Sequence, residues 1–127
     1  MKRILALVII ALTTTFANAQ SQPERYMFTG KLTNVSTVTT DCGSGSVAVA
    51  YEFTVSMLSD YSYTDQSIAI LVKCPESYGT DFFKVGSTYK MELFDAVSGT
   101  YTIANPQVLN NYNLPHNYWA GDIKRLQ

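Results

Sequence analysis

Histidine, tryptophan and cysteine are scarce in this chain, which has one histidine, one tryptophan and two cysteines among 127 residues. The cysteines, Cys42 and Cys74, form no Cys-x-x-Cys pair, and neither lies beside the histidine. Such spacings are typical of zinc sites and of redox-active thiol pairs. Their absence argues against both kinds of chemistry, and we expect no metal and no cofactor.

The single histidine, His116, has no sequence signature of a catalytic site around it. A histidine catalyst requires an orienting carboxylate and a nucleophile, and no motif supplies them. No acidic spacing resembles an EF-hand calcium loop, and a domain this small has little room for the deep cleft of a glycoside hydrolase. We therefore predict no catalytic residues and no enzyme activity. The acidic turn residues, interpreted as solvated, are Asp41, Asp60, Asp65, Glu76 and Asp81.

The beginning of the chain predicts a cleavable export signal. A basic start precedes nine apolar residues, Ile4–Leu12, whereas a membrane-spanning helix needs about 20 residues. The small residues of Ala17–Ala19 suit signal peptidase, so we expect residues 1–19 to be removed. The alternatives are an uncleaved anchor or a buried strand. The mature protein, residues 20–127, would be a single domain that is secreted or periplasmic and does not insert into the membrane.

The mature part would also be poor in basic residues. Without the two basic residues of the expected signal it has seven basic and ten acidic side chains, for a net charge near −3. Such a chain has no electrostatic reason to bind nucleic acid or anionic lipid. Its expected partner is therefore an unknown protein or a glycan.

The cysteine pair predicts one disulfide, because an even pair in an oxidising compartment most simply forms a bridge. Cys42 and Cys74 would close a loop that stabilises the fold by roughly 3–4 kcal/mol on the chain-entropy model. Two free thiols are the alternative.

Abundant threonine, serine, valine and tyrosine favour strands over helices. The clearest strand is 47–58, where apolar residues from Val47 to Met57 alternate with small or polar ones, so that one face lies in the core. The other face of this strand is only moderately polar, which predicts that another part of the chain partly covers it. We expect further strands at 26–40, 67–74, 88–96 and 119–126, a bend at Gly30, a helical turn at 80–84, a short strand at 101–104 and an irregular segment at 105–118.

This order of elements predicts an all-β fold, specifically a five-stranded OB-like Greek-key barrel. In a meander, the ends of the first and third strands lie at one edge of the sheet, where Cys42 and Cys74 could meet. The alternative is a β-sandwich of the immunoglobulin type, which has about seven strands and a tryptophan between its cysteines. Here the only tryptophan, Trp119, follows both cysteines.

The segment from Cys74 to Tyr89 resembles the netrin and tissue-inhibitor-of-metalloproteinases type of secreted OB domain. The residues that match its motif are Phe83, Val85, Gly86 and Tyr89. The resemblance implies the OB fold. Inhibitors of this type chelate the protease metal through an amino-terminal cysteine, whereas the mature chain would begin at Gln20. The resemblance therefore does not imply that mechanism.

Two aromatic loops are the best lead to a function. Tyrosine, tryptophan and asparagine suit sugar stacking or a wet protein interface, and OB barrels bind oligosaccharides through loops beside strands two and three. We predict a ligand-binding patch made of Tyr61, Tyr63, Tyr112, His116 and Tyr118. The alternative is that 112–119 covers an open barrel end as a lid, with Trp119 buried.

These observations favour an exported small binding module whose ligand is a glycan or a protein. An inhibitor of a secreted hydrolase is the alternative, and a small enzyme is the least favoured.

Overall fold

The computed structural model describes residues 22–36, 41–43 and 45–126, so the expected signal peptide and the end of the predicted first strand lie outside the described part. The strands are β1 (Arg25–Asn34), β2 (Val47–Leu58), β3 (Ser67–Lys73), β4 (Thr88–Phe94), β5 (Thr102–Ile103) and β6 (Trp119–Arg125). Two short 3-10 helices, η1 (Pro75–Tyr78) and η2 (Pro106–Asn111), lie between them.

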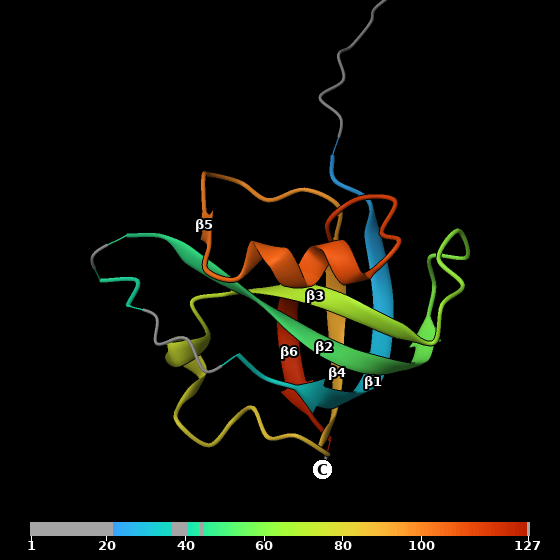
Figure 1. Cartoon of the computed structure of the whole chain (residues 1–127), viewed down its shortest axis with the longest axis horizontal. Helices are drawn as coiled ribbons and strands as arrows, with labels where there is room; N and C mark the ends of the chain where they lie inside the picture. The colour runs from blue at the N-terminus through green and yellow to red at the C-terminus, as the bar shows by residue number, and fades with distance from the viewer. Residues whose placement is uncertain (1–21, 37–40, 44, 127) are drawn as a thin grey trace, which may run out of the picture.

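The main strands close into a ring (Figure 1). β1, β2 and β3 form an antiparallel meander, β1 also pairs with β4, and β4 pairs with β6. β6 meets β3 in parallel at a single residue pair, Leu71 opposite Trp119, and β5 adds to β2 in parallel. The all-β prediction is confirmed. Because one junction is so short, the ring is not a complete barrel, and it is consistent with an OB-like barrel or a β-sandwich.

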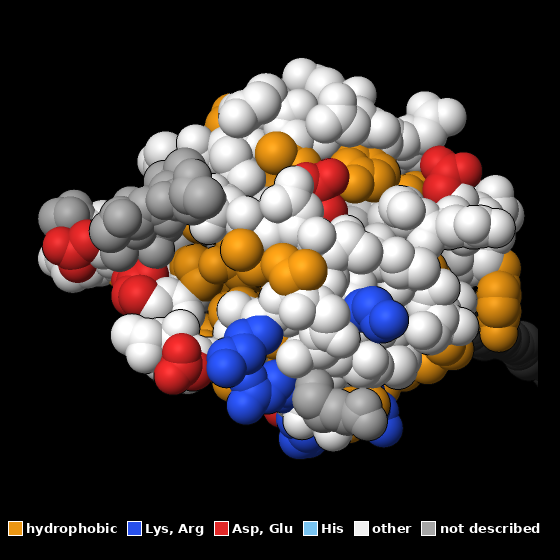
Figure 2. Space-filling model, turned by 60° about the horizontal axis from the view of Figure 1, so that its bottom comes forward, with side chains coloured by type: hydrophobic (Ala, Val, Ile, Leu, Met, Phe, Trp, Pro, Cys, Tyr) orange, Lys and Arg blue, Asp and Glu red, His pale blue; other side chains and the backbone are white. Residues whose placement is uncertain are grey.

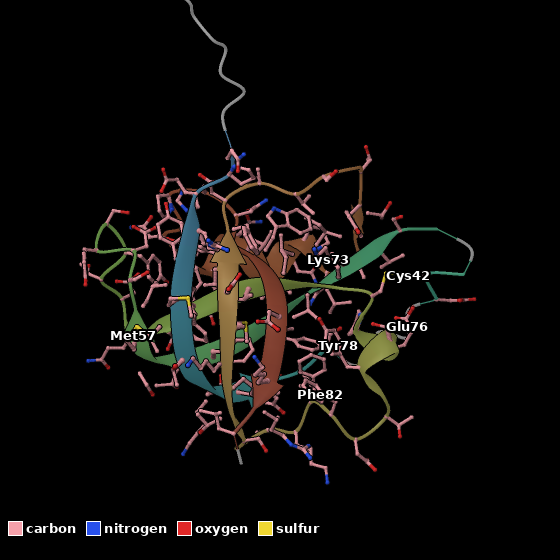
Figure 3. The ribbon with its side chains drawn as sticks, turned by 180° about the vertical axis from the view of Figure 1, so that it is seen from behind. Cys42, Met57, Lys73, Glu76, Tyr78 and Phe82 are labelled. Carbon is pink, nitrogen blue, oxygen red and sulfur yellow. A yellow bond between two sulfur atoms is a disulfide. The ribbon has the colours of Figure 1, made fainter. Side chains whose placement is uncertain are left out.

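The alternation along β2 places its middle in the inner core, as predicted: Val49, Tyr51 and Phe53 are buried. The two ends of this apolar series were also expected in the core, but Val47 is half-buried and Met57 is 43% exposed. β2 pairs with β3 only as far as Thr54, so its last residues extend past the ring beside β1 alone. Figure 3 shows Met57 at this end, far from the disulfide.

The outer face of β2 and β3 is also covered, as its moderately polar composition predicted. Ala48, Ala50, Leu71 and Trp119 are buried there in a second cluster. The segment between β4 and β6 packs against it, and Figure 1 shows η2 lying alongside β3. This covering positions the candidate site described below.

The helical turn predicted at 80–84 is wrong in position, because η1 lies earlier, at Pro75–Tyr78. Proline suits the first turn of a helix, where its missing N–H is not needed. Phe82 and Phe83 instead pack in a loop against Tyr89. The irregular segment also contains η2, which likewise begins with a proline.

The loop after η1 covers one end of the ring. Phe82 stacks on Tyr78 with ring centroids 5.1 Å apart, and the Arg125 guanidinium lies 5.9 Å from the centre of the Phe82 ring. Figure 3 labels Tyr78 and Phe82, which lie next to each other. Figure 2 brings this end forward and shows hydrophobic side chains between acidic and basic ones. Most of these aromatic side chains contact one another, so we assign them a structural role in closing this end of the ring.

The predicted disulfide is confirmed: Cys42 and Cys74 are bonded, with Cα atoms 5.8 Å apart. The Glu76 carboxylate lies near both sulfur atoms and accepts a hydrogen bond from the Cys42 N–H. Since both sulfurs belong to the disulfide, this group offers no thiolate ligand to a metal. Among the described residues, no helix is long and apolar enough to cross a membrane.

Candidate functional site

The structure separates the predicted patch into three parts. Tyr63, His116 and Tyr118 meet Tyr26 and Asp60 in what we call the Asp60 cluster. Tyr112 instead hydrogen-bonds to Glu52 of β2, and Tyr61 is exposed in the loop between β2 and β3, whereas Tyr63 and Tyr118 are buried. The five residues therefore do not form one continuous surface.

The buried Asp60 carboxylate connects two loops that are far apart in the sequence. It accepts hydrogen bonds from the Tyr118 hydroxyl at 2.7 Å, the Ser62 hydroxyl at 2.6 Å and the Ser62 N–H at 3.1 Å. Burial alone would raise the pKa of Asp60, but these hydrogen bonds and the nearby His116 outweigh it, so the pKa lies below its ordinary value. The loop of residues 59–66 is thereby tied to the strand entry at Tyr118.

His116 lies at the margin of this cluster. Its Nε2 is 3.5 Å from Oδ2 of Asp60 and forms no hydrogen bond within the described residues. Its ring stacks against Tyr26 and meets Tyr118 edge to face, with centroids 5.9 Å and 4.6 Å away. These contacts hold His116 against β1 and the start of β6.

Tyr118 and Tyr63 are buried inside the Asp60 cluster, so they support the two loops and do not form a binding surface. Tyr118 has no exposed area, and burial together with the Asp60 hydrogen bond raises the pKa of its hydroxyl. Tyr63 donates its hydroxyl to the Ser67 carbonyl, and burial, with a smaller contribution from Asp65, raises the pKa of Tyr63 to about 12. Both tyrosines are therefore held neutral in the folded protein.

The first groove lies between η2 and the loop that follows it, with a volume of about 700 Å³. Its lining is Pro106, Gln107, Leu109, Asn110, Tyr112, Leu114 and Asn117. Three of these residues carry amide groups, which both donate and accept hydrogen bonds. Leucine and proline add apolar surface. This combination of amides and apolar groups can hold an uncharged polar ligand.

A second groove of about 320 Å³ lies between η2, β2 and the end of β1, and it shares Gln107 with the first. It is lined by Asn34, Val35, Ser36, Ala50, Glu52, Asn105, Gln107 and Val108. Both linings therefore include residues of η2, and they share one residue.

The position of η2 between the grooves is held by two side chains. Asn105 accepts a hydrogen bond from the Ala50 N–H at 2.8 Å and donates one to the Ala50 carbonyl at 3.0 Å, in the middle of β2. Tyr112 donates its hydroxyl to Oε1 of Glu52 at 2.5 Å. Burial and this carboxylate raise the pKa of Tyr112. Both ends of η2 are thus fastened to β2.

Tyr61 stands out from the rest of the molecule. Its side chain is 87% exposed at the tip of the loop between β2 and β3, which extends from the ring in Figure 1. The Asp60 hydrogen bonds to Ser62 brace the base of this loop.

Sequence reasoning missed the residues that line the grooves. Gln107, Asn110 and Asn117 lie in the asparagine-rich segment, whose composition could have indicated them. Glu52 and Asn34 carried no signal, because each is an ordinary polar residue of an alternating strand. Comparison with known proteins finds no family model, no curated protein and no solved structure that matches this chain.

Proposed function

We propose that this protein is an exported binding module for a glycan and not an enzyme. The observation that carries the proposal is the first groove, whose lining offers three amides, a tyrosine and apolar side chains. Amides match the donor and acceptor pattern of sugar hydroxyls, and apolar groups suit the C–H faces of sugar rings. Tyr112, the one lining residue that can ionise, already donates its hydroxyl to Glu52.

Export and an OB-like barrel form part of the same proposal. The disulfide supports an oxidising compartment, secreted or periplasmic. The ring order β1-β2-β3-β6-β4 supports the barrel. The netrin-type motif gains support from Gly86, whose φ of +96° favours glycine, and from Tyr89, which is fully buried.

Removing a groove amide should weaken glycan binding. With mature protein on a glycan array, followed by calorimetry on the best ligand, Asn117→Ala or Gln107→Ala should lower affinity about tenfold, because one hydrogen bond contributes roughly 1–1.5 kcal/mol. Asn113→Ala is the matched control, since Asn113 is exposed and outside the groove lining. Equal binding by Asn117→Ala, Gln107→Ala and the unaltered protein would remove the groove from consideration.

A second candidate function, inhibition of a secreted hydrolase, is favoured by Tyr61. An exposed aromatic side chain on a braced loop is preordered for insertion into a partner's pocket, so little conformational entropy is lost on binding. In a screen against secreted proteases and lysozymes, Tyr61→Ala should weaken any inhibition more than tenfold. Thr64→Ala, in the same loop, should not.

The Tyr61→Ala variant also distinguishes the two functions. Glycan affinity should be unchanged in it, because Tyr61 is not part of either groove lining. A screen in which no hydrolase is inhibited, or in which Tyr61→Ala inhibits as well as the unaltered protein, would exclude inhibition through this loop.

A further inference from the structure

The Glu52 carboxylate links the linings of the two grooves. It lines the second groove, and its Oε1 accepts the hydroxyl of Tyr112, which lines the first. Its Oε2 accepts a hydrogen bond from the Asn34 amide at 2.8 Å. A ligand that occupies both grooves would therefore contact this carboxylate.

The charge of Glu52 is not compensated locally. Tyr112 and Asn34 are neutral donors, so they orient the carboxylate without cancelling its charge. Within the part of the chain that the structure describes, the ion pairs are those of Glu92, Asp60 and Asp122, and none involves Glu52. The side chain is only half-buried, which leaves it within reach of a ligand.

The geometry points to a ligand with an ammonium group on a sugar frame. We infer that the second groove binds the protonated amine of an amino sugar, in an oligosaccharide that spans both grooves; this inference rests on the proposed function. Hydroxyl groups would be bound by the amides of the first groove, and the ammonium group would pair with Glu52. An acetylated amine carries no charge and would lose this pairing. The negative net charge of the mature chain adds a weak general attraction for such a ligand.

Calorimetry with two oligosaccharides of equal length tests this inference. The probes are oligomers of glucosamine and of N-acetylglucosamine, at about pH 6, below the ordinary pKa of an amine. The unaltered protein should bind the glucosamine oligomer about three- to fivefold more tightly, the effect of one partly exposed ion pair. Glu52→Gln should abolish this preference, because its amide oxygen still accepts the Tyr112 hydroxyl but carries no charge.

Two controls make the result specific. Asp65→Asn removes the same charge from an exposed loop position outside both grooves, and it should retain the preference. About 0.5 M salt should reduce the preference of the unaltered protein, since screening weakens an exposed pair. The salt measurement decides the question even where Glu52→Gln fails to fold.

The possible failures are distinguishable. Equal affinity of the unaltered protein for both oligomers, or a preference that survives salt, would overturn the inference and leave the proposed function intact. Binding of neither oligomer, together with no binding on the glycan array, would overturn the proposed function itself.

Discussion

Replacing Gly30 with alanine is expected to destabilise the domain by about 3 kcal/mol or more, a large part of the stability that a small domain usually has. A Cβ atom at this position would lie 2.4 Å from Cζ of Phe28 and 2.5 Å from the Thr54 carbonyl oxygen. Phe28 is fully buried, and the Thr54 oxygen belongs to the backbone of the neighbouring strand. Neither can move without disturbing the core or the sheet.

The position of Gly30 explains why the approach is so close. Thr29 pairs with Met57, but Gly30 pairs with Val55, so the register between β1 and β2 shifts at this residue. A bulge bends the strand and brings the two backbones together, and glycine is often found at such places. The irregularity thus lies at Gly30, although the extra residue, Ser56, belongs to β2, and the substitution would act on the pairing of β1 with β2.

Chemical unfolding of purified protein, followed by circular dichroism, measures the effect. Gly45→Ala is the matched control, because an added Cβ there meets nothing within 4 Å. Its free energy of unfolding should stay within about 0.5 kcal/mol of the unaltered value. A Gly30→Ala protein as stable as the Gly45→Ala protein would show that the two strands can separate at little cost.

Removing the disulfide should destabilise the fold by about 3–4 kcal/mol. The bridge joins residues 32 apart in the sequence, and the chain-entropy model gives this value for a loop of that length. The loss is a large fraction of the stability that a small domain usually has. The double variant Cys42→Ser with Cys74→Ser should therefore unfold at a urea concentration lower by on the order of 2 M.

Reductant supplies the control for this prediction. It should lower the midpoint of the unaltered protein to that of the double variant and leave the double variant unchanged. Two thiols that react with an alkylating reagent in the native, unreduced protein would contradict the bridge directly. Equal midpoints with and without reductant would show that the bridge does not stabilise the fold.

The predicted patch illustrates where sequence reasoning stops. Tyr118 and Asp60 are 58 residues apart, and Tyr112 and Glu52 are 60 apart, yet each pair is joined by a hydrogen bond. Spacing along the chain carries no information about such pairs, so a buried tyrosine and a groove tyrosine appear alike in the sequence. The role of Tyr118 as a support for the loops became visible only in three dimensions.

The position of η1 was also not predictable from the sequence, although the residues involved are close together in the chain. The residues of 75–78 and of 80–84 both allow one helical turn, and local preference does not decide between them. In the folded protein Phe82 and Phe83 pack against Tyr89, and this packing favours a loop at 80–84. Tertiary contacts commonly override weak propensities of this size.

The sequence by itself determined the strand content, the bounds of β2 and the pairing of the two cysteines. Strand alternation is a local pattern with a period of two residues, and two cysteines allow only one internal bridge. Only the tertiary structure decided that η2 folds back on β2 and creates the two grooves around Gln107. The physical reason is that this placement depends on long-range contacts, chiefly the Asn105 and Tyr112 hydrogen bonds to β2, which form only once the sheet has assembled.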